Sequence, residues 1–232
     1  MSTGIKKFVM INGSPKASPR SVSGTLAAQA ADLFRAKGIE TSVISARHSQ
    51  NTGGNESSFA DMRGADGLLF VFPLYYFCVP SLLMRFMQDY ADSLAAGGGP
   101  SKPQQVYAVV NCGFPEPDIN EEAVRVIQSF SRHIGASFRF GVLLGCGGML
   151  AEVKDAPFMK KAVQQMDQAF SQMAQDVLDG NEAARSNVSI AIKVPRRLYY
   201  FMGNRGWFSL ARGNKLKKKD LYARPYAPGA DI

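Results

Sequence analysis

Long apolar runs, histidines and paired cysteines are scarce in these 232 residues. No apolar stretch approaches the roughly 18 residues that a membrane-spanning helix needs, so the sequence predicts no such helix. The apolar stretch near the start, Phe8 to Ile11, is also shorter than the core of a secretory signal peptide. Three cysteines spaced 34 residues apart form neither a CxxC motif nor a disulfide framework. That spacing favours the reducing cytoplasm and predicts no metal site.

Several catalytic motifs are missing as well. The chain has no GxGxxG, no GxxxxGK[ST] and no GxSxG. These absences disfavour a permanently held NAD or ATP, and they disfavour serine hydrolase chemistry. The two histidines, His48 and His133, fall in a polar segment and at a predicted helix end, so neither is a strong candidate for a catalytic base.

Charge is distributed unevenly. Hydrophobic residues make up 46% of the chain and charged residues 20%, which is typical of globular proteins and excludes disorder for most of the length. The net charge is +8, yet the first 192 residues carry 17 basic and 17 acidic side chains. The whole excess of positive charge therefore lies in residues 193–232, and the first 192 residues are neutral overall.

Strand-like and helix-like patterns alternate along the chain. The predicted strands are residues 7–12, 40–45, 67–72, 105–111 and 137–144, and the predicted helices are 23–37, 57–63, 82–94, 120–134 and 158–178. Residues 46–57 are polar and glycine-rich, which predicts a loop. Continuous apolar strands alternating with helices predict an α/β fold, a doubly wound five-stranded parallel sheet in the flavodoxin-like order 2-1-3-4-5. We predict one domain over residues 1–182 and a basic, aromatic-rich arm over 183–232.

In such a sheet, ligands bind beyond the carboxyl ends of the strands. The segment after the first strand holds hydroxyls, cations and a helix start, and its candidate residues are Ser14, Lys16, Arg20, Ser21 and Ser23. Together they predict a phosphate site. The alternative is that Ser21 or Ser23 only caps the helix.

The segments after the third, fourth and fifth strands are also unusual. Three successive aromatics follow the third strand, in the run Pro73, Leu74, Tyr75, Tyr76, Phe77. They suit a flat amphipathic ring, or else they pack on another subunit. The fourth strand is followed by Asn111, Cys112, Gly113 and Phe114, and the fifth by Gly145–Met149. Glycine there permits close approach of a ligand to the backbone.

These motifs, in this order, resemble the NAD(P)H-dependent FMN reductase family of flavodoxin-like flavoproteins over roughly residues 5–180. The resemblance implies FMN as cofactor and NAD(P)H as hydride donor. It assigns Ser14, Lys16, Ser21 and Ser23 to the phosphate, Pro73–Phe77 to the isoalloxazine, and Asn111–Phe114 to its other side. It implies a homodimer and no obligatory acid–base side chain. Residues 46–66 contain no cysteine, so we predict no iron–sulfur cluster of the kind that related flavoproteins carry.

The resulting hypothesis is a cytoplasmic FMN-dependent NAD(P)H oxidoreductase that reduces a small acceptor such as a flavin or quinone. The alternative is a flavodoxin-type electron carrier. Residues 195–226 interleave cations with aromatics. They are either a structural arm folded over a domain of their own or a partner chain, or a contact with an anionic membrane surface. No nucleic-acid recognition module is visible, so we predict no nucleic-acid partner.

Overall fold

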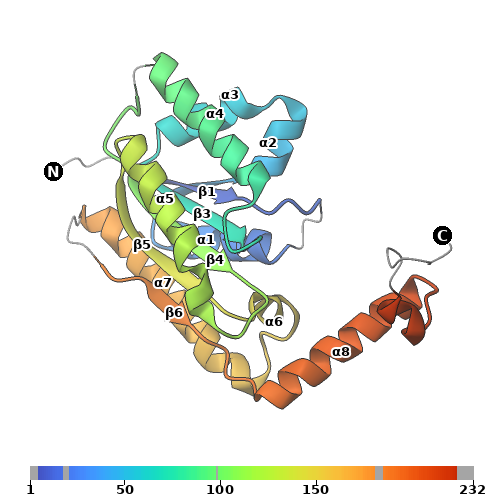
Figure 1. The fold of residues 1–232 in the computed structure, drawn as a ribbon. Helices are drawn as coiled ribbons and strands as arrows, with labels where there is room; N and C mark the ends of the chain where they lie inside the picture. Colours follow the sequence, from blue (N-terminus) through green and yellow to red (C-terminus); the bar gives the residue numbers. More distant parts are fainter. Residues whose placement is uncertain (1–4, 18–20, 98, 181–184, 224–232) are drawn as a thin grey trace. The chain divides into compact units, whose positions relative to one another are not determined.

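The computed structural model describes residues 5–17, 21–97, 99–180 and 185–223 (Figure 1). The chain divides into two compact units, Met1–Ile192 and Lys193–Ile232. Arg20 and Tyr226 lie outside the described residues, so the predictions that involve them stay untested.

The first unit contains a six-stranded sheet in the order β2-β1-β3-β4-β5-β6, and every neighbouring pair is parallel. The strands are β1 (Lys7–Asn12), β2 (Glu40–Ser45), β3 (Gly67–Pro73), β4 (Gln105–Asn111), β5 (Ser137–Leu144) and β6 (Val188–Ile190). The five predicted strands and their order are confirmed. The prediction that the sheet stops at five strands is wrong.

The sixth strand falls in a segment that the sequence assigned to the arm. It has only three residues, and Ile190 is its one buried side chain. Tertiary hydrogen bonds hold it beside β5. The N–H of Gly145 donates to the carbonyl of Ile190 at 3.0 Å, and the N–H of Gly141 donates to Asn187 Oδ1 at 2.8 Å. Val188, Ile190 and Ile192 recur at every second position, a strand-like period that could have identified β6 from the sequence.

Seven helices of the first unit connect and cover the strands. They are α1 (Val22–Ala36), α2 (Ala46–Thr52), α3 (Asn55–Arg63), α4 (Ser81–Gly97), α5 (Glu121–His133), α6 (Gly147–Glu152) and α7 (Lys160–Asp179), with 3₁₀ turns at Pro117–Asn120 and Pro157–Met159. The sequence predicted a loop where α2 lies. Ser45 caps α2 by accepting from the N–H of His48, and Gly53 ends it with φ 69°. The glycines taken as loop signals therefore mark a helix end.

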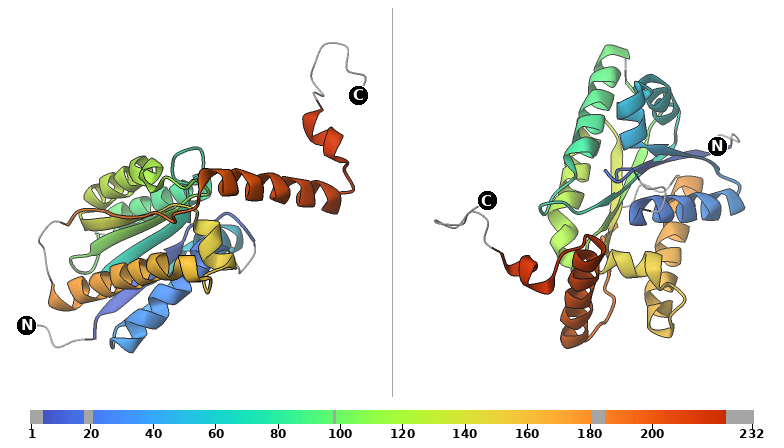
Figure 2. Two further views of the ribbon diagram at one scale, coloured as in Figure 1. Left: turned by 90° about the horizontal axis from the view of Figure 1, so that it is seen from below. Right: turned by 90° about the vertical axis from the view of Figure 1, so that its right-hand side faces the viewer.

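The sheet lies between two layers of helices. Figure 2 shows α1 and α7 on one face and α4 and α5 on the other. On the α4 face, Phe70 and Phe72 of β3 belong to the same buried cluster as Phe86 of α4. On the α1 face, the rings of Phe8 and Phe34 meet edge to face, with centroids 4.6 Å apart. Because both faces are covered, the strands read as continuous apolar runs.

The second unit contains α8 (Arg196–Gly213) and a 3₁₀ turn at Lys218–Tyr222. The sequence predicted no regular element here, because its apolar residues follow no clean helical period. The N–H of Leu216 returns to the carbonyl of Ala211 at 2.8 Å and closes the helix end. Within the described ranges, no helix is both long and apolar enough to cross a membrane.

Candidate functional site

The segment after β1 is held tightly against the sheet. Asn12 Oδ1 accepts from the N–H of Ser14 at 3.1 Å, and the buried Ser14 hydroxyl accepts from the N–H of Lys16 at 3.3 Å. A Cβ on Gly13 would lie only 2.5 Å from Leu83 Cδ2 of α4. Glycine therefore lets the chain pass close to Leu83 of α4 and Phe72 of β3, which a side chain here would have to displace.

The start of α1 uses both predicted serines. Ser21 is the N-cap, and its hydroxyl accepts from the N–H of Gly24 at 3.1 Å. Ser23 is buried, and its hydroxyl accepts from Asn111 Nδ2 at 3.0 Å. The capping role foreseen for Ser21 is thus observed. This cap is compatible with the predicted phosphate site, because the other N–H groups in the first turn of a helix still attract anions.

The aromatic segment after β3 forms a tight two-residue turn. Tyr75 and Cys78 exchange two backbone hydrogen bonds of 3.0 Å each. Between them, Tyr76 and Phe77 have φ angles of 50° and 59°. Such angles strain residues other than glycine, and strained positions cluster at functional sites. Tyr76 is fully exposed and Phe77 is 61% exposed, so the strain places two aromatic rings in solvent.

The end of β4 joins three elements. Asn111 is buried, and its amide nitrogen donates to both Ser23 Oγ and the carbonyl of Phe72, each at 3.0 Å. The N–H of Leu74 donates to the carbonyl of Asn111 at 2.8 Å. Asn111 therefore ties the ends of β3 and β4 to the start of α1.

Phe114 follows and projects beside the aromatic turn. Its ring centroid lies 6.2 Å from that of Phe77, and the two rings are nearly parallel at 19°. Gly113 has no heavy atom within 4 Å of the position that a Cβ would take, so the backbone there is open on that side. Two loops from neighbouring strands thus present flat apolar surfaces together.

The segment after β5 packs under the segment after β4. Cys146 has φ 51°, and its N–H donates to the carbonyl of Phe114 at 2.7 Å. A Cβ on Gly147 would lie 2.8 Å from Cβ of Asn111. The sequence expected only a turn or a ligand contact here, but the segment supports the Asn111 and Phe114 backbone and starts α6.

The two cysteines at this edge are chemically quiet. Burial raises the pKa of the Cys112 thiol, and it raises that of Cys146 to about 11. Both are therefore protonated at neutral pH, which disfavours a role as nucleophile. The described residues contain no cluster of three or more metal-ligating side chains.

A cleft of about 420 Å³ opens at this edge of the sheet. Its lining residues, Leu74, Tyr75, Tyr76, Phe77 and Phe114, all belong to the set predicted to hold the flavin ring. The cleft residues follow β3 and β4, and β1 lies next to β3 in the sheet. The residues predicted to hold the phosphate follow β1, so they lie beside the cleft residues in the order of the strands; they are Ser14, Lys16, Ser21 and Ser23. The predicted residues thus gather at one edge.

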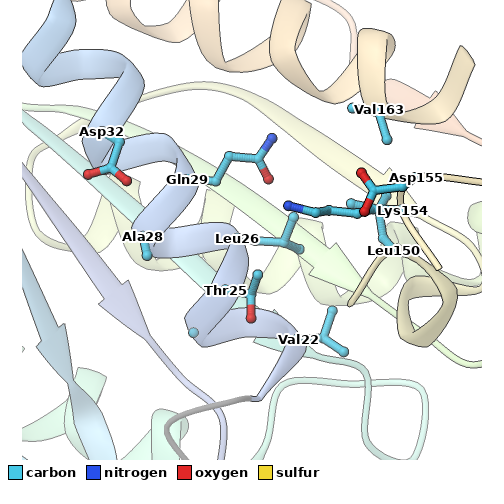
Figure 3. A pocket seen from close by; sticks show the side chains of 11 residues that line it. Val22, Thr25, Leu26, Ala28, Gln29, Asp32, Leu150, Lys154, Asp155 and Val163 are labelled. Atoms are coloured by element: carbon cyan, nitrogen blue, oxygen red, sulfur yellow. The ribbon is translucent and has the colours of Figure 1, made fainter. Parts of the chain in front are cut away.

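A second pocket, of about 630 Å³, contains none of the predicted site residues. It lies between α1 and the segment that leads into α7, and Figure 3 shows Gln29 projecting from α1 toward Lys154. Gln29 also donates to Asp167 Oδ1 at 2.8 Å. The sequence gave no indication of this pocket, because its walls come from segments more than 100 residues apart.

Comparisons with known proteins agree with this architecture. The chain resembles a flavone reductase at 14% identity, covering 78% of this chain and 66% of that one, with a TM-score of 0.59. It resembles an NADH:FMN oxidoreductase at 17% identity, with coverages of 74% and 89% and a TM-score of 0.57. It also resembles an NADPH-quinone reductase from P. pentosaceus at 16% identity, with coverages of 73% and 98% and a TM-score of 0.55.

At these identities the solved structures establish the fold alone. No curated protein shows a significant sequence match to the chain. A family model described as flavodoxin-like fold matches residues 6–170, which confirms the family resemblance that the sequence motifs indicated. The chain therefore belongs to the family of flavodoxin-like fold proteins that this model describes.

Proposed function

We propose that the protein is an FMN-dependent NAD(P)H oxidoreductase. One observation carries this proposal: the aromatic cleft is lined entirely by the residues after β3 and β4 that were expected to flank an isoalloxazine. The similar solved structures include proteins named as NADH:FMN oxidoreductase and NADPH-quinone reductase, which agrees with this choice.

The residues present fit FMN. The ring would lie in the cleft against Tyr75, Tyr76 and Phe77, with Phe114 on its other side and the open backbone at Gly113 beside it. The phosphate would be held at the start of α1 by Ser14, Lys16, Ser21 and Ser23. Pro73 and Leu74 begin the aromatic turn, and Asn111 and Cys112 fix the end of β4 below it.

The protein's contribution is binding, orientation and exclusion of water. The chemistry that FMN supplies when bound is acceptance of a hydride from NAD(P)H and its transfer to a small acceptor such as a flavin or quinone. The strained turn at Tyr76 and Phe77 holds two aromatic side chains at the cleft. The Asn111 hydrogen bonds hold the phosphate and ring segments in a fixed relation. We assign no side chain as catalytic.

The proposal includes a homodimer in the cytoplasm. An exposed aromatic cleft open to solvent would gain from a second chain that covers it. Contact of residues 195–226 with a membrane surface, the alternative to a structural arm, concerns the second unit and does not depend on this chemistry.

The test is the absorbance spectrum of the purified full chain after addition of FMN and desalting, followed by anaerobic addition of NADH or NADPH. Retained flavin bands that bleach with nicotinamide support the reductase. Retained bands that do not bleach favour the flavodoxin-type electron carrier, and a folded protein that retains no flavin contradicts both.

A matched pair of variants locates the flavin. Phe77→Ala combined with Phe114→Ala removes the two parallel rings, and we expect FMN affinity to fall at least tenfold, about 1.4 kcal/mol. Phe158→Ala removes an equally exposed ring outside the cleft and should leave the affinity unchanged. Equal affinity in all three proteins would place the flavin elsewhere.

A further inference from the structure

Helix α8 exposes large apolar side chains along its whole length. Trp207 is the most exposed of them at 65%, and the others are Leu198, Tyr200, Phe201, Met202 and Leu210. Exposed apolar side chains gathered on one element often mark an interaction site.

The same segment is strongly basic. Residues 193–223 hold nine lysines and arginines and a single acidic residue, Asp220. The Asp220 carboxylate accepts from the N–H of Lys217 at 2.7 Å, so it serves the start of the 3₁₀ turn. Cations lie directly on aromatic rings: the guanidinium carbon of Arg205 is 5.7 Å from the Phe201 centroid, and Lys218 Nζ is 4.8 Å from that of Phe208.

The helical period separates part of these groups onto opposite sides. Tyr200, Trp207 and Leu210 are seven and three residues apart, which places them on one side of α8. Arg205 and Arg212 are also seven apart and lie on the opposite side. Phe201 and Phe208 flank the arginine side. The separation is partial, because Leu198 and Met202 fall on the arginine side. A helix that interleaves exposed rings with cations suits an interface between water and hydrocarbon, where rings are buried and arginines reach the headgroups.

Charge complementarity selects the partner. The first 192 residues carry 17 basic and 17 acidic side chains, so a second copy of this chain offers no net negative charge. The corresponding segments of two copies repel each other. A nucleic acid would satisfy the cations but not the exposed aliphatic side chain of Leu210, which gains only from burial in an apolar phase. An anionic phospholipid surface satisfies both.

We propose that α8 and the following turn bind the surface of a membrane that contains anionic phospholipids, with α8 lying in the plane of the interface. Tyr200, Trp207 and Leu210 enter the boundary with the acyl chains, and the lysines and arginines contact the phosphate groups. The helix does not cross the membrane. This binding is independent of the proposed redox chemistry, and its test involves no flavin.

Trp207 is the only tryptophan of the chain, so its fluorescence reports on α8 alone. The full-length protein is mixed with vesicles of phosphatidylglycerol and phosphatidylcholine, or with vesicles of phosphatidylcholine only, and is then sedimented. We expect a blue shift of Trp207 emission and sedimentation with the anionic vesicles. Binding to the neutral vesicles should be at least tenfold weaker, and added salt should weaken binding to the anionic ones.

Two variants separate the contributions. Arg205→Glu with Arg212→Glu should reduce binding to anionic vesicles at least tenfold, and Leu210→Ser should reduce it while leaving its salt dependence intact. The matched control, Arg35→Glu with Arg125→Glu, makes the same change of net charge on exposed residues of α1 and α5 and should bind like the parent protein. Circular dichroism verifies that each variant is folded.

Three results would overturn the proposal. One is the absence of any blue shift or sedimentation with anionic vesicles. A second is a blue shift that follows protein concentration without vesicles, which would assign α8 to a second copy of the chain. The third is tighter binding to a DNA duplex than to vesicles at equal salt.

Discussion

The side-chain amide of Asn111 donates a hydrogen bond of 3.0 Å to the hydroxyl of Ser23, 88 residues earlier in the chain. Both side chains are buried. The bond connects the end of β4, where the aromatic cleft begins, to the first turn of α1, where the phosphate would be held. The two halves of the proposed flavin site are therefore positioned by one contact between segments that are distant in the sequence.

Replacement of Ser21 and Ser23 by alanine should weaken FMN binding by about 1–3 kcal/mol, because hydroxyl bonds to a charged phosphate would be lost. The measurement is fluorescence titration of FMN with the folded double variant. Ser45→Ala is the control, since Ser45 caps α2 in the same way as Ser21 caps α1 but lies outside the proposed site. Unchanged affinity in the double variant would reject the phosphate assignment.

Tyr76→Gly should stabilise the protein without ligand by about 1 kcal/mol, because glycine adopts the φ of 50° without strain. The same change removes a ring from the cleft, so FMN affinity should fall. Urea unfolding and FMN titration on the same sample measure the two effects. A control at Tyr75→Gly, next to the strained positions, should give no stabilisation. A loss of stability at position 76 would show that the turn is not strained.

Two adjacent glycines of α6 provide a matched pair. Gly147→Ala would bring a Cβ within 2.8 Å of Asn111 Cβ, whereas a Cβ on Gly148 has no heavy atom within 4 Å. We expect Gly147→Ala to lower the free energy of unfolding by about 1–3 kcal/mol through overpacking. Gly148→Ala should leave it unchanged or raise it by up to about 1 kcal/mol, because alanine favours helix. Urea midpoints decide between these outcomes, and equal midpoints would contradict the close packing at Asn111.

The buried thiol of Cys146 should make stability fall at alkaline pH. Its pKa is about 11 in the folded protein against 9.0 for an unperturbed thiol, because burial disfavours the thiolate. Its contribution is complete below pH 9 and is lost as the pH rises toward 11, since only the unfolded chain releases the proton in that window. The measurement is the difference in urea midpoint between the parent protein and Cys146→Ala at pH 7 and pH 10. A difference that does not change with pH would contradict the assignment.

The sequence carried most of the architecture. Residues of β1, β2, β4 and β5 were predicted with their observed bounds. For β1, β4 and β5 the reason is that buried parallel strands are short, mostly apolar runs that glycine, proline or polar residues end. The flavodoxin-like order followed from the alternation of strands and helices. That order places the residues after β1, β3 and β4 at the same edge of the sheet, because the carboxyl ends of parallel strands lie together.

Other elements have no comparable pattern in the sequence. Helices α2 and α6 are short and begin or end at glycines, so their composition matches that of loops. Helix α8 has apolar residues on more than one side. In these helices tertiary hydrogen bonds or neighbouring segments, not local periodicity, define the element. Strand β6 is different, because Val188, Ile190 and Ile192 alternate with small or polar residues and could have been recognised as a strand.

The sequence by itself determined the doubly wound sheet, the neutral charge of its first 192 residues and the residue types gathered at its carboxyl edge. Local patterns suffice for these features, because each depends on which side chains follow one another along the chain. Only the tertiary structure decided that Asn111 meets Ser23, that Phe77 lies parallel to Phe114, and that Tyr76 is held in a strained turn. Those relations depend on the pairing of strands β1, β3 and β4 in the sheet. No local sequence pattern encodes the distance between residues that are so far apart in the chain.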